Sequence, residues 1–191
     1  GAITSRRTDR RPFSDWQIPG DSRRRLENAA VGQGAILRMV SVGGPRAVLL
    51  EAIREAEAQQ KDRPGYATEL AMWTGRRAGD DGVPAANLLY ARTAGIPASR
   101  AFPEGDIGPY PLGRQDGAEL AVLGTASDDT LSRLRAGEAL SAVLLTATSL
   151  GLAACPLSQP LEIGVTRRTL RDDVLSGTLC PQIVLRLGWS P

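Results

Sequence analysis

Four arginines lie within the nine residues Ser5-Arg-Arg-Thr-Asp-Arg-Arg-Pro-Phe13, close to the start of the chain. The single acid among them, Asp9, cannot neutralise four guanidinium groups, and each guanidinium presents a fixed fork of donors that matches a phosphate or a carboxylate. The segment therefore either binds an anion or forms a solvated basic arm. The apolar residues Phe13, Trp16 and Ile18 favour an anion site, because they would anchor the segment to the body of the protein.

A second stretch that could do chemistry is Ala153-Ala-Cys-Pro-Leu-Ser-Gln-Pro160, which we expect to be a loop after a buried helix. Its two prolines stiffen it. The backbone amides of Leu157, Ser158 and Gln159 would then be free to donate to a flat ligand. Taken alone, the stretch is equally consistent with an ordinary loop after the C-terminus of a helix.

The composition argues against several classes of function. The 191-residue chain has no histidine, which is the commonest general base and metal ligand, and its two cysteines, Cys155 and Cys180, lack the spacing of a zinc site. We therefore expect reduced thiols in a cytoplasmic protein and no bound metal. The net charge of +2 argues against a nucleic-acid-binding protein. No run of about eighteen apolar residues is present, so no membrane span is expected.

Hydrophobic periodicity predicts the elements that must hold these two stretches. We expect helices over about 21–31, 46–60, around 70–73, 127–150 and 165–175, and strands over 35–42, 119–124 and 182–187. Ser127 is expected to cap the longest helix, and its second half is apolar on all sides, which places it at the centre of the core. This order of elements predicts an α+β domain with a modest sheet.

Residues 75–117 break the periodic pattern, since Gly, Pro, Asp and Arg dominate them. Loops longer than about fifteen residues inside a compact domain are usually functional or disordered. We interpret this stretch as an irregular excursion or lid within one domain that spans residues 1–191.

Taken together, the motifs resemble the FMN-dependent nitroreductase family. An Arg-Arg-Ser-x-Arg segment of that family grips the flavin phosphate and ribityl chain, and Arg6-Arg-Thr-Asp-Arg10 is similar to it, with Thr in place of Ser. The family's long central helix ends in Ala-x-x-Leu-Gly-Leu, which here reads Ala147-Thr-Ser-Leu-Gly-Leu152. A turn along the flavin edge follows in the family, and Pro156-Leu-Ser-Gln159 occupies its place. The resemblance implies a nitroreductase-like fold with a central mixed or antiparallel sheet, flanking helices and a long buried core helix.

Phrases spread over nearly the whole chain resemble the Acg-like branch of the family in actinobacteria. They are RRTDRRPF, AxWTGRR, DDGVPAAN, LRAGEALSAVLLTATSLGLA, PLSQPLE and PQIVLRLGW. Members of this branch are about twice as long and hold two nitroreductase-like halves fused like a dimer. This chain is similar to the C-terminal half, which implies a second half or a homodimer partner.

One departure from the family lies between the first expected helix and strand. Nitroreductases usually carry Asn-x-Gln-Pro-Trp there, facing the flavin of the opposite half. Here the stretch reads Ala30-Val-Gly-Gln-Gly-Ala-Ile36, and only Gln33 of the phrase is left. The resemblance therefore implies that this chain alone builds part of an FMN site.

The resemblance further implies a reductase that passes two electrons from NAD(P)H through FMN to nitro or quinone compounds. Arg6 and Arg10, with Arg7, would clamp the phosphate, and Thr8 would bond the ring or the ribityl chain. The amide of Ser158 would approach flavin N5. No side-chain acid or base is required, so no catalytic residue is assigned. The remaining expected cofactor-binding residues are Pro156, Leu157 and Gln159.

Two other functions stay open at this point. One is a flavin-binding or flavin-sequestering protein without turnover. In such a protein, the 75–117 excursion or the missing facing half would close the substrate side of the flavin. The stretch around Gln33, which has lost most of the family phrase, favours this alternative. A nucleic-acid-binding module would use the N-terminal arginines and bind with a steep salt dependence. The low net charge and the lack of a recognisable reader fold argue against that module.

Overall fold

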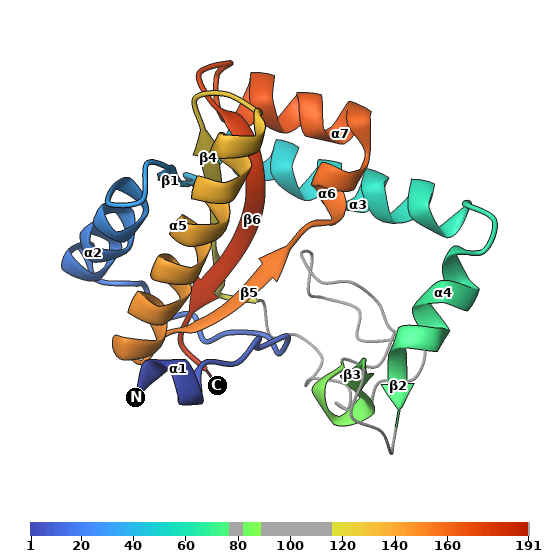
Figure 1. Ribbon diagram of the computed structural model, residues 1–191, viewed down its shortest axis with the longest axis horizontal. Coiled ribbons are helices and arrows are strands. Elements are labelled where there is room, and N and C mark those ends of the chain that lie inside the picture. Colours follow the sequence, from blue (N-terminus) through green and yellow to red (C-terminus); the bar gives the residue numbers. More distant parts are fainter. Residues whose placement is uncertain (77–81, 89–115, 191) are drawn as a thin grey trace.

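A four-stranded antiparallel sheet forms the centre of the molecule (Figure 1). The computed structural model describes residues 1–76, 82–88 and 116–190. The strands lie in the order β1 (Ile36–Met39), β4 (Glu119–Thr125), β6 (Cys180–Gly188) and β5 (Ala153–Leu157). Helices cover both faces of the sheet, so the predicted α+β class is confirmed.

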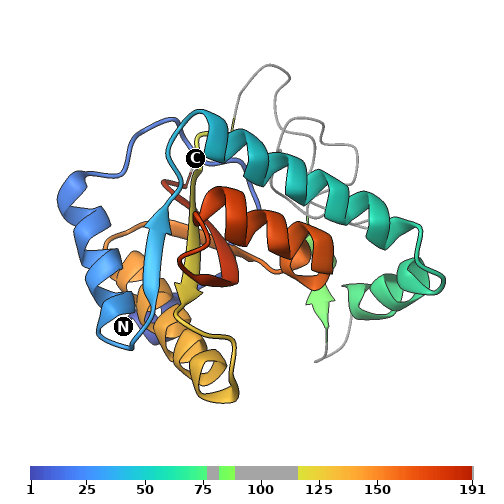
Figure 2. The ribbon, with the colours of Figure 1, turned by 90° about the horizontal axis from the view of Figure 1, so that it is seen from above.

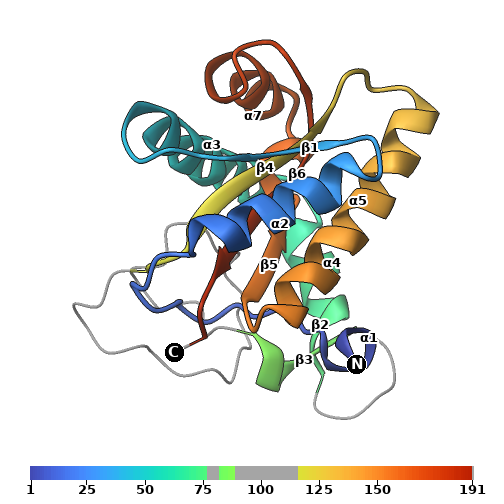
Figure 3. The ribbon, with the colours of Figure 1, turned by 90° about the vertical axis from the view of Figure 1, so that its left-hand side faces the viewer.

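One face of the sheet is covered by α2 (Gly20–Val31) and α5 (Thr130–Ser149), which lie side by side (Figure 3). Strand residues alternate between the two faces, and Leu123 of β4 and Leu185 of β6 point into this layer. The core between sheet and helices is completed by Leu26, Ala30, Ala139, Val143, Leu144 and Ala147.

The opposite face is covered by α3 (Gly44–Lys61), α6 (Gln159–Glu162) and α7 (Gly164–Thr169), which continues into the turn η2 (Leu170–Val174). Seen from above, the strands lie between the two helical layers (Figure 2). Val122 and Val184 point into this second core, where they meet Leu49, Ile53, Leu170 and Leu175.

Two parts of the chain lie outside these layers. The short helix α1 (Ala2–Ser5) contacts α5. The helix α4 (Tyr66–Trp73) leads away from the sheet into β2 (Thr74–Arg76) (Figure 1). Strand β2 pairs with β3 (Val83–Pro84), which is followed by the turn η1 (Ala85–Asn87). Most of the predicted 75–117 excursion lies outside the described residues, and its interpretation as a lid stays a prediction.

The prediction for the cap and surroundings of the longest helix was wrong in two respects. Asp129, not Ser127, caps α5: its carboxylate accepts a hydrogen bond from the Ser132 amide at 2.8 Å, while the Ser127 hydroxyl donates to Asp129. A carboxylate at this position also complements the helix dipole. In addition, Ser141 and Ser149 in the second half of the helix are exposed, so α5 covers the sheet with one side and leaves the other side open.

The expected loop over 153–160 was also wrong, because its first half is the strand β5 and its second half contains α6. Proline lacks an amide donor and is tolerated in a sheet mainly on edge strands. β5 is such an edge strand, with β6 as its one partner in the sheet, so Pro156 can lie opposite Leu185.

Candidate functional site

The arginine segment, residues 6–11, lies against the edge strand β5. Thr8 forms a parallel bridge with Ala154, and the Asp9 amide donates to the Ala154 carbonyl at 3.0 Å. The two stretches singled out in the sequence are therefore neighbours in space, although about 145 residues separate them.

A cavity of about 500 Å³ opens beside this segment. We call it the arginine cavity. Arg10 reaches across it, since its Nη1 donates to the Asn87 carbonyl of η1 at 3.2 Å. The lining consists of Arg7, Thr8, Asp9, Arg10 and Arg11 on one side and Val83, Ala86 and Asn87 on the other.

The charges in the arginine cavity do not cancel. Burial raises the pKa of Asp9, but hydrogen bonds from the Arg11 side chain and amide lower it by more. The pKa of Asp9 is therefore below its usual value, and the carboxylate stays ionised. Arg11 also donates to the Ser190 hydroxyl at 2.7 Å. Among the described residues, Arg7 has no hydrogen-bond or ion-pair partner. Guanidinium donors beside a hydroxyl suit a phosphate that carries a polyol.

Arg6 lies apart from the arginine cavity. It lines a separate groove of about 440 Å³ along α5, together with Ile3, Gly137, Leu140, Ser141, Leu144 and Leu145. We call this the α5 groove. The structure thus brings Arg7, Thr8 and Arg10 together and leaves Arg6 beside a mainly apolar surface.

The four expected residues at the end of β5 point in different directions. Leu157 is buried in the core, and Gln159 is buried with its amide donating to Gln60 Oε1 at 2.9 Å. Ser158 is exposed, and its hydroxyl donates to Glu162 at 2.6 Å. Pro156 is half-buried. Within the part of the chain that the structure describes, none of the four lines the arginine cavity.

Several curated proteins with related sequences are named as candidate nitroreductases. A Mycobacterium tuberculosis protein named as a candidate NAD(P)H nitroreductase is 42% identical over 206 residues, and this match covers 100% of the chain. A second M. tuberculosis protein, the candidate NAD(P)H nitroreductase Acg, is 32% identical over 195 residues and again matches 100% of the chain. The chain belongs to the nitroreductase family, in the branch of Acg.

Solved structures agree on the fold of this nitroreductase-family chain. An FMN-bound nitroreductase from Bacteroides fragilis superposes with a TM-score of 0.60 at 16% identity, covering 100% of this chain and 87% of its own. The FMN-dependent nitroreductase NfnB from M. smegmatis, solved with NADPH, gives 0.59 at 16% identity, covering 99% and 86%. The predicted nitroreductase fold is confirmed.

The chain spans about half the length of the curated relatives it matches, 55% of the first and 57% of Acg. No family model matches it. The assignment to the C-terminal half therefore stays a prediction.

Sequence reasoning missed the residues that hold the arginine segment of this nitroreductase-family chain in place. Arg186 of β6 and Asp116 are both buried and form an ion pair at 2.8 Å. Arg186 Nη2 also donates to the Arg11 carbonyl at 3.1 Å, and Asp116 Oδ1 accepts from the Phe13 amide at 2.9 Å. The one available signal was an arginine within the apolar run Ile183-Val-Leu-Arg-Leu187, since buried charges in strands need partners.

Cys155 lies directly opposite Arg186 in the β5–β6 pair. Burial raises the pKa of the Cys155 thiol, and the positive charges of Arg186 and Arg10 oppose this rise without cancelling it. The thiol is therefore a neutral, buried group beneath the arginine segment.

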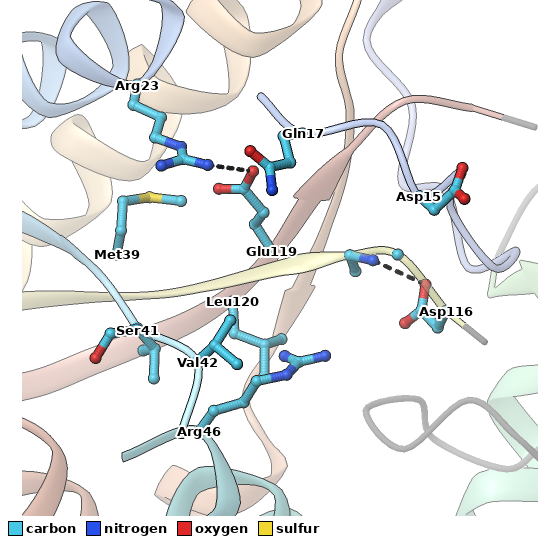
Figure 4. A pocket seen from close by; sticks show the side chains of 13 residues that line it. Asp15, Gln17, Arg23, Met39, Ser41, Val42, Arg46, Asp116, Glu119 and Leu120 are labelled. Atoms are coloured by element: carbon cyan, nitrogen blue, oxygen red, sulfur yellow. Dashed lines mark hydrogen bonds and ion pairs between the residues drawn. The ribbon is translucent and has the colours of Figure 1, made fainter. Parts of the chain in front are cut away.

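A further cavity of about 410 Å³ lies at the start of β4, between the N-terminal segment and the beginning of α3 (Figure 4). Arg23 of α2 and Glu119 form an ion pair at 2.8 Å inside it, and the same Glu119 oxygen accepts from the Ile18 amide at 2.8 Å. Asp116 and Glu119 thus each hold one backbone amide of the N-terminal segment, and each pairs with an arginine from another element.

Over residues 1–76, 82–88 and 116–190, no cluster of three or more His, Cys, Asp or Glu side chains is placed to hold a metal ion. Over the same ranges, no helix has both the length and the hydropathy to cross a bilayer.

Proposed function

We propose that this chain contributes an FMN site to a nitroreductase-type oxidoreductase that reduces nitro or quinone compounds with NAD(P)H. The observation that carries the proposal is the arginine cavity, in which Arg7, Thr8 and Arg10 converge beside β5. The FMN and NADPH in the solved relatives support the choice of ligand.

Each residue of the arginine cavity has a distinct part in this proposal. Arg7 and Arg10 bind the phosphate through charge-assisted hydrogen bonds. Thr8 offers a hydroxyl to the ribityl chain or the ring. The backbone amide of Ser158, which is exposed at the end of β5, would bond the reactive edge of the ring. Arg6 is left out of the phosphate site because it lines the α5 groove.

FMN, when bound, supplies the two-electron chemistry, and the protein supplies binding, orientation and electrostatics. The positive charges of Arg7 and Arg10 favour the anionic phosphate and fix one end of the ligand. No side chain of this chain needs to act as an acid or a base, which suits the lack of histidine.

The proposed partner is a second nitroreductase-like half, in the same polypeptide or in a second copy. The curated relatives are nearly twice as long as this chain, and the α5 groove combines the half-buried Leu140 and Leu145 with the exposed small residues Gly137 and Ser141. Small residues let a second helix approach closely, and Leu134, 61% exposed, extends the apolar surface. The partner would supply the wall of the FMN site that this chain lacks.

A flavin-binding protein without turnover is the second candidate. The observation that favours it is the turn after α2, in which Gln33 is the only residue of the family phrase. Gly34 of this turn lies against the Arg135 side chain of α5, and Gln33 does not line the arginine cavity. A partner with an equally depleted turn would bind flavin and leave no productive place for the substrate.

The test is a flavin titration followed by a turnover assay. The chain, alone and mixed with a second half, is titrated with FMN and assayed for NAD(P)H oxidation with a nitroaromatic and a quinone. Flavin binding with turnover supports the oxidoreductase, and flavin binding without turnover supports the second candidate. No flavin binding in either sample contradicts both.

A further inference from the structure

The arginine segment is fixed at its far end by a buried ion pair. Arg186 Nε and Nη2 donate to Asp116 Oδ2 at 3.2 and 2.8 Å, and both side chains are at least 97% buried. A charge in such surroundings is strongly unfavourable unless it is paired and hydrogen-bonded. The two residues therefore depend on each other for their place in the fold.

The same two side chains grip the backbone of the segment. Arg186 Nη2 donates to the Arg11 carbonyl, and Asp116 Oδ1 accepts from the amides of Phe13 and Ala118. The guanidinium carbon also lies 4.6 Å from the centre of the Phe13 ring, within the range of a cation–π contact. The ion pair thus fixes Arg11 and Phe13 from both sides.

Close packing against two glycines restricts the positions that Phe13 and Ser14 can take. A Cβ on Gly188 would lie 3.0 Å from the Phe13 ring, and a Cβ on Gly117 would lie 2.1 Å from the Ser14 carbonyl. Both glycines therefore permit a close approach of the segment to β4 and β6. The other end of the segment is held by the Thr8–Ala154 bridge.

We propose that Arg186 and Asp116 are positioning residues that preorganise the arginine segment, so that Arg7 and Arg10 face the arginine cavity before any ligand arrives. This inference rests on the proposed FMN site for its functional meaning. Neither residue lines the arginine cavity, so each acts through the backbone of the segment. A preorganised site avoids the ordering cost that a loose segment would incur on binding.

A matched control lies close by in the chain. The Arg23–Glu119 pair joins a carboxylate at the start of β4, three residues after Asp116, to an arginine of another element. It also holds an amide of the N-terminal segment, that of Ile18. Glu119 holds the amide of Ile18, which lies five residues beyond Phe13 and therefore further from the arginine segment. Loss of this pair should therefore disturb stability without moving Arg7 and Arg10.

The experiment compares the double variants Arg186→Met/Asp116→Asn and Arg23→Met/Glu119→Gln, which remove each pair without leaving a lone buried charge. FMN affinity is measured at a temperature where circular dichroism shows each variant folded. We expect the first variant to bind FMN at least about tenfold more weakly and the control within about twofold of the unchanged chain. An equal loss in both variants, or none in the first, overturns the inference.

Hydrogen exchange in the cofactor-free chain keeps the test decisive if a variant does not fold or if the chain binds no FMN. The amides of Asp9 and Phe13 should be protected in the unchanged chain, by about tenfold or more over an unstructured segment. The conservative variant Arg186→Lys keeps the charge but loses the planar fork, and with it the Nε bond to Asp116, so it should lose part of this protection. Unprotected amides in the unchanged chain would overturn the inference, whereas protected amides without FMN binding would contradict the proposed function alone.

Discussion

Asp9 and Arg11 hold each other through two hydrogen bonds, from Arg11 Nε to Asp9 Oδ1 at 3.0 Å and from Nη2 to Oδ2 at 2.6 Å. This pair engages the one acid of the segment and one of its four arginines. Arg7 and Arg10 line the same cavity. The ion pair thereby engages Arg11 and leaves Asp9 neutralised beside the two arginines that we propose for an anionic ligand.

Replacing Arg10 should weaken FMN binding more than replacing an arginine elsewhere. The Arg10→Ala variant loses a charge-assisted phosphate contact, and we expect its affinity to fall by more than about tenfold in a flavin fluorescence titration. Arg54→Ala is the matched control, since Arg54 lies on the exposed side of α3 and pairs with Glu51. An unchanged titration for Arg10→Ala would refute the assignment of the phosphate site.

Gln159 should matter for stability and not for the cofactor. Its buried amide donates to Gln60, so Gln159→Ala leaves Gln60 Oε1 with one partner fewer and should cost about 1–3 kcal/mol of unfolding free energy in urea. Gln59→Ala, which removes an exposed contact to Glu55, serves as the control. A selective loss of FMN affinity with unchanged stability would instead support the predicted cofactor role of Gln159.

The two glycines Gly188 and Gly137 should respond in opposite ways to a methyl group. Gly188→Ala places a Cβ 3.0 Å from the buried Phe13 ring and should destabilise the fold by roughly 1–3 kcal/mol. Gly137→Ala meets nothing within 4 Å and should stabilise α5 by about 0.5–1 kcal/mol. Thermal unfolding measures both, and a tolerated Gly188→Ala would show that Phe13 is not held as described.

Much of the fold was predictable because α2, α3, β4 and β6 each show an apolar face with a regular period. β5 was not, because its proline and its small residues carry no strand pattern and its pairing depends on β6, about 30 residues further along. The cap of α5 was not predictable either. Ser127 and Asp129 are both suitable capping residues, and the local sequence does not determine which side chain bonds the amide of the first turn.

For the site, Arg7, Thr8 and Arg10 were predictable because they are adjacent in the sequence. The groups around them were not. Asn87, which receives the Arg10 hydrogen bond, is 77 residues away, and Asp116 is 103 residues from the Phe13 amide it holds. No periodicity links residues so far apart, and long-range pairing is decided by packing of the whole sheet.

Asp128 should make part of the stability dependent on pH. Hydrogen bonds from Arg133 and Gln182, with the charge of Arg167, lower its pKa from 3.8 to about 2. A lowered pKa means that the contribution is complete above about pH 4 and is lost as the pH falls toward 2. With about a third of the side chain exposed, solvent screening limits it to on the order of 1 kcal/mol.

The measurement for Asp128 is urea unfolding of Asp128→Asn between about pH 7 and pH 3. The difference from the unchanged chain should shrink as the pH falls below about 4. Asp172→Asn, whose carboxylate is 62% exposed and 4.0 Å from Arg171, should show little difference at any of these pH values. A difference for Asp128→Asn that is constant with pH would contradict the assignment.

The two thiols should differ in reactivity. Burial raises the pKa of Cys155, which is 3% exposed, whereas Cys180 is half-buried. A thiol reagent should therefore label Cys180 first and Cys155 at least about tenfold more slowly in the native state, with both reacting alike in denaturant. Single Cys→Ala variants assign the two phases, and a fast native Cys155 would show that β5 is open to solvent.

The grip of Arg186 on Arg11 also has a consequence for the order of folding. These two residues are 175 positions apart, so closing that contact carries one of the largest loop-closure entropies available in this chain. Contacts of such high sequence separation form late, after local helices and hairpins. During synthesis, the arginine segment emerges well before β6 and cannot complete its docking until β6 has been made, so the proposed FMN-binding segment should mature late.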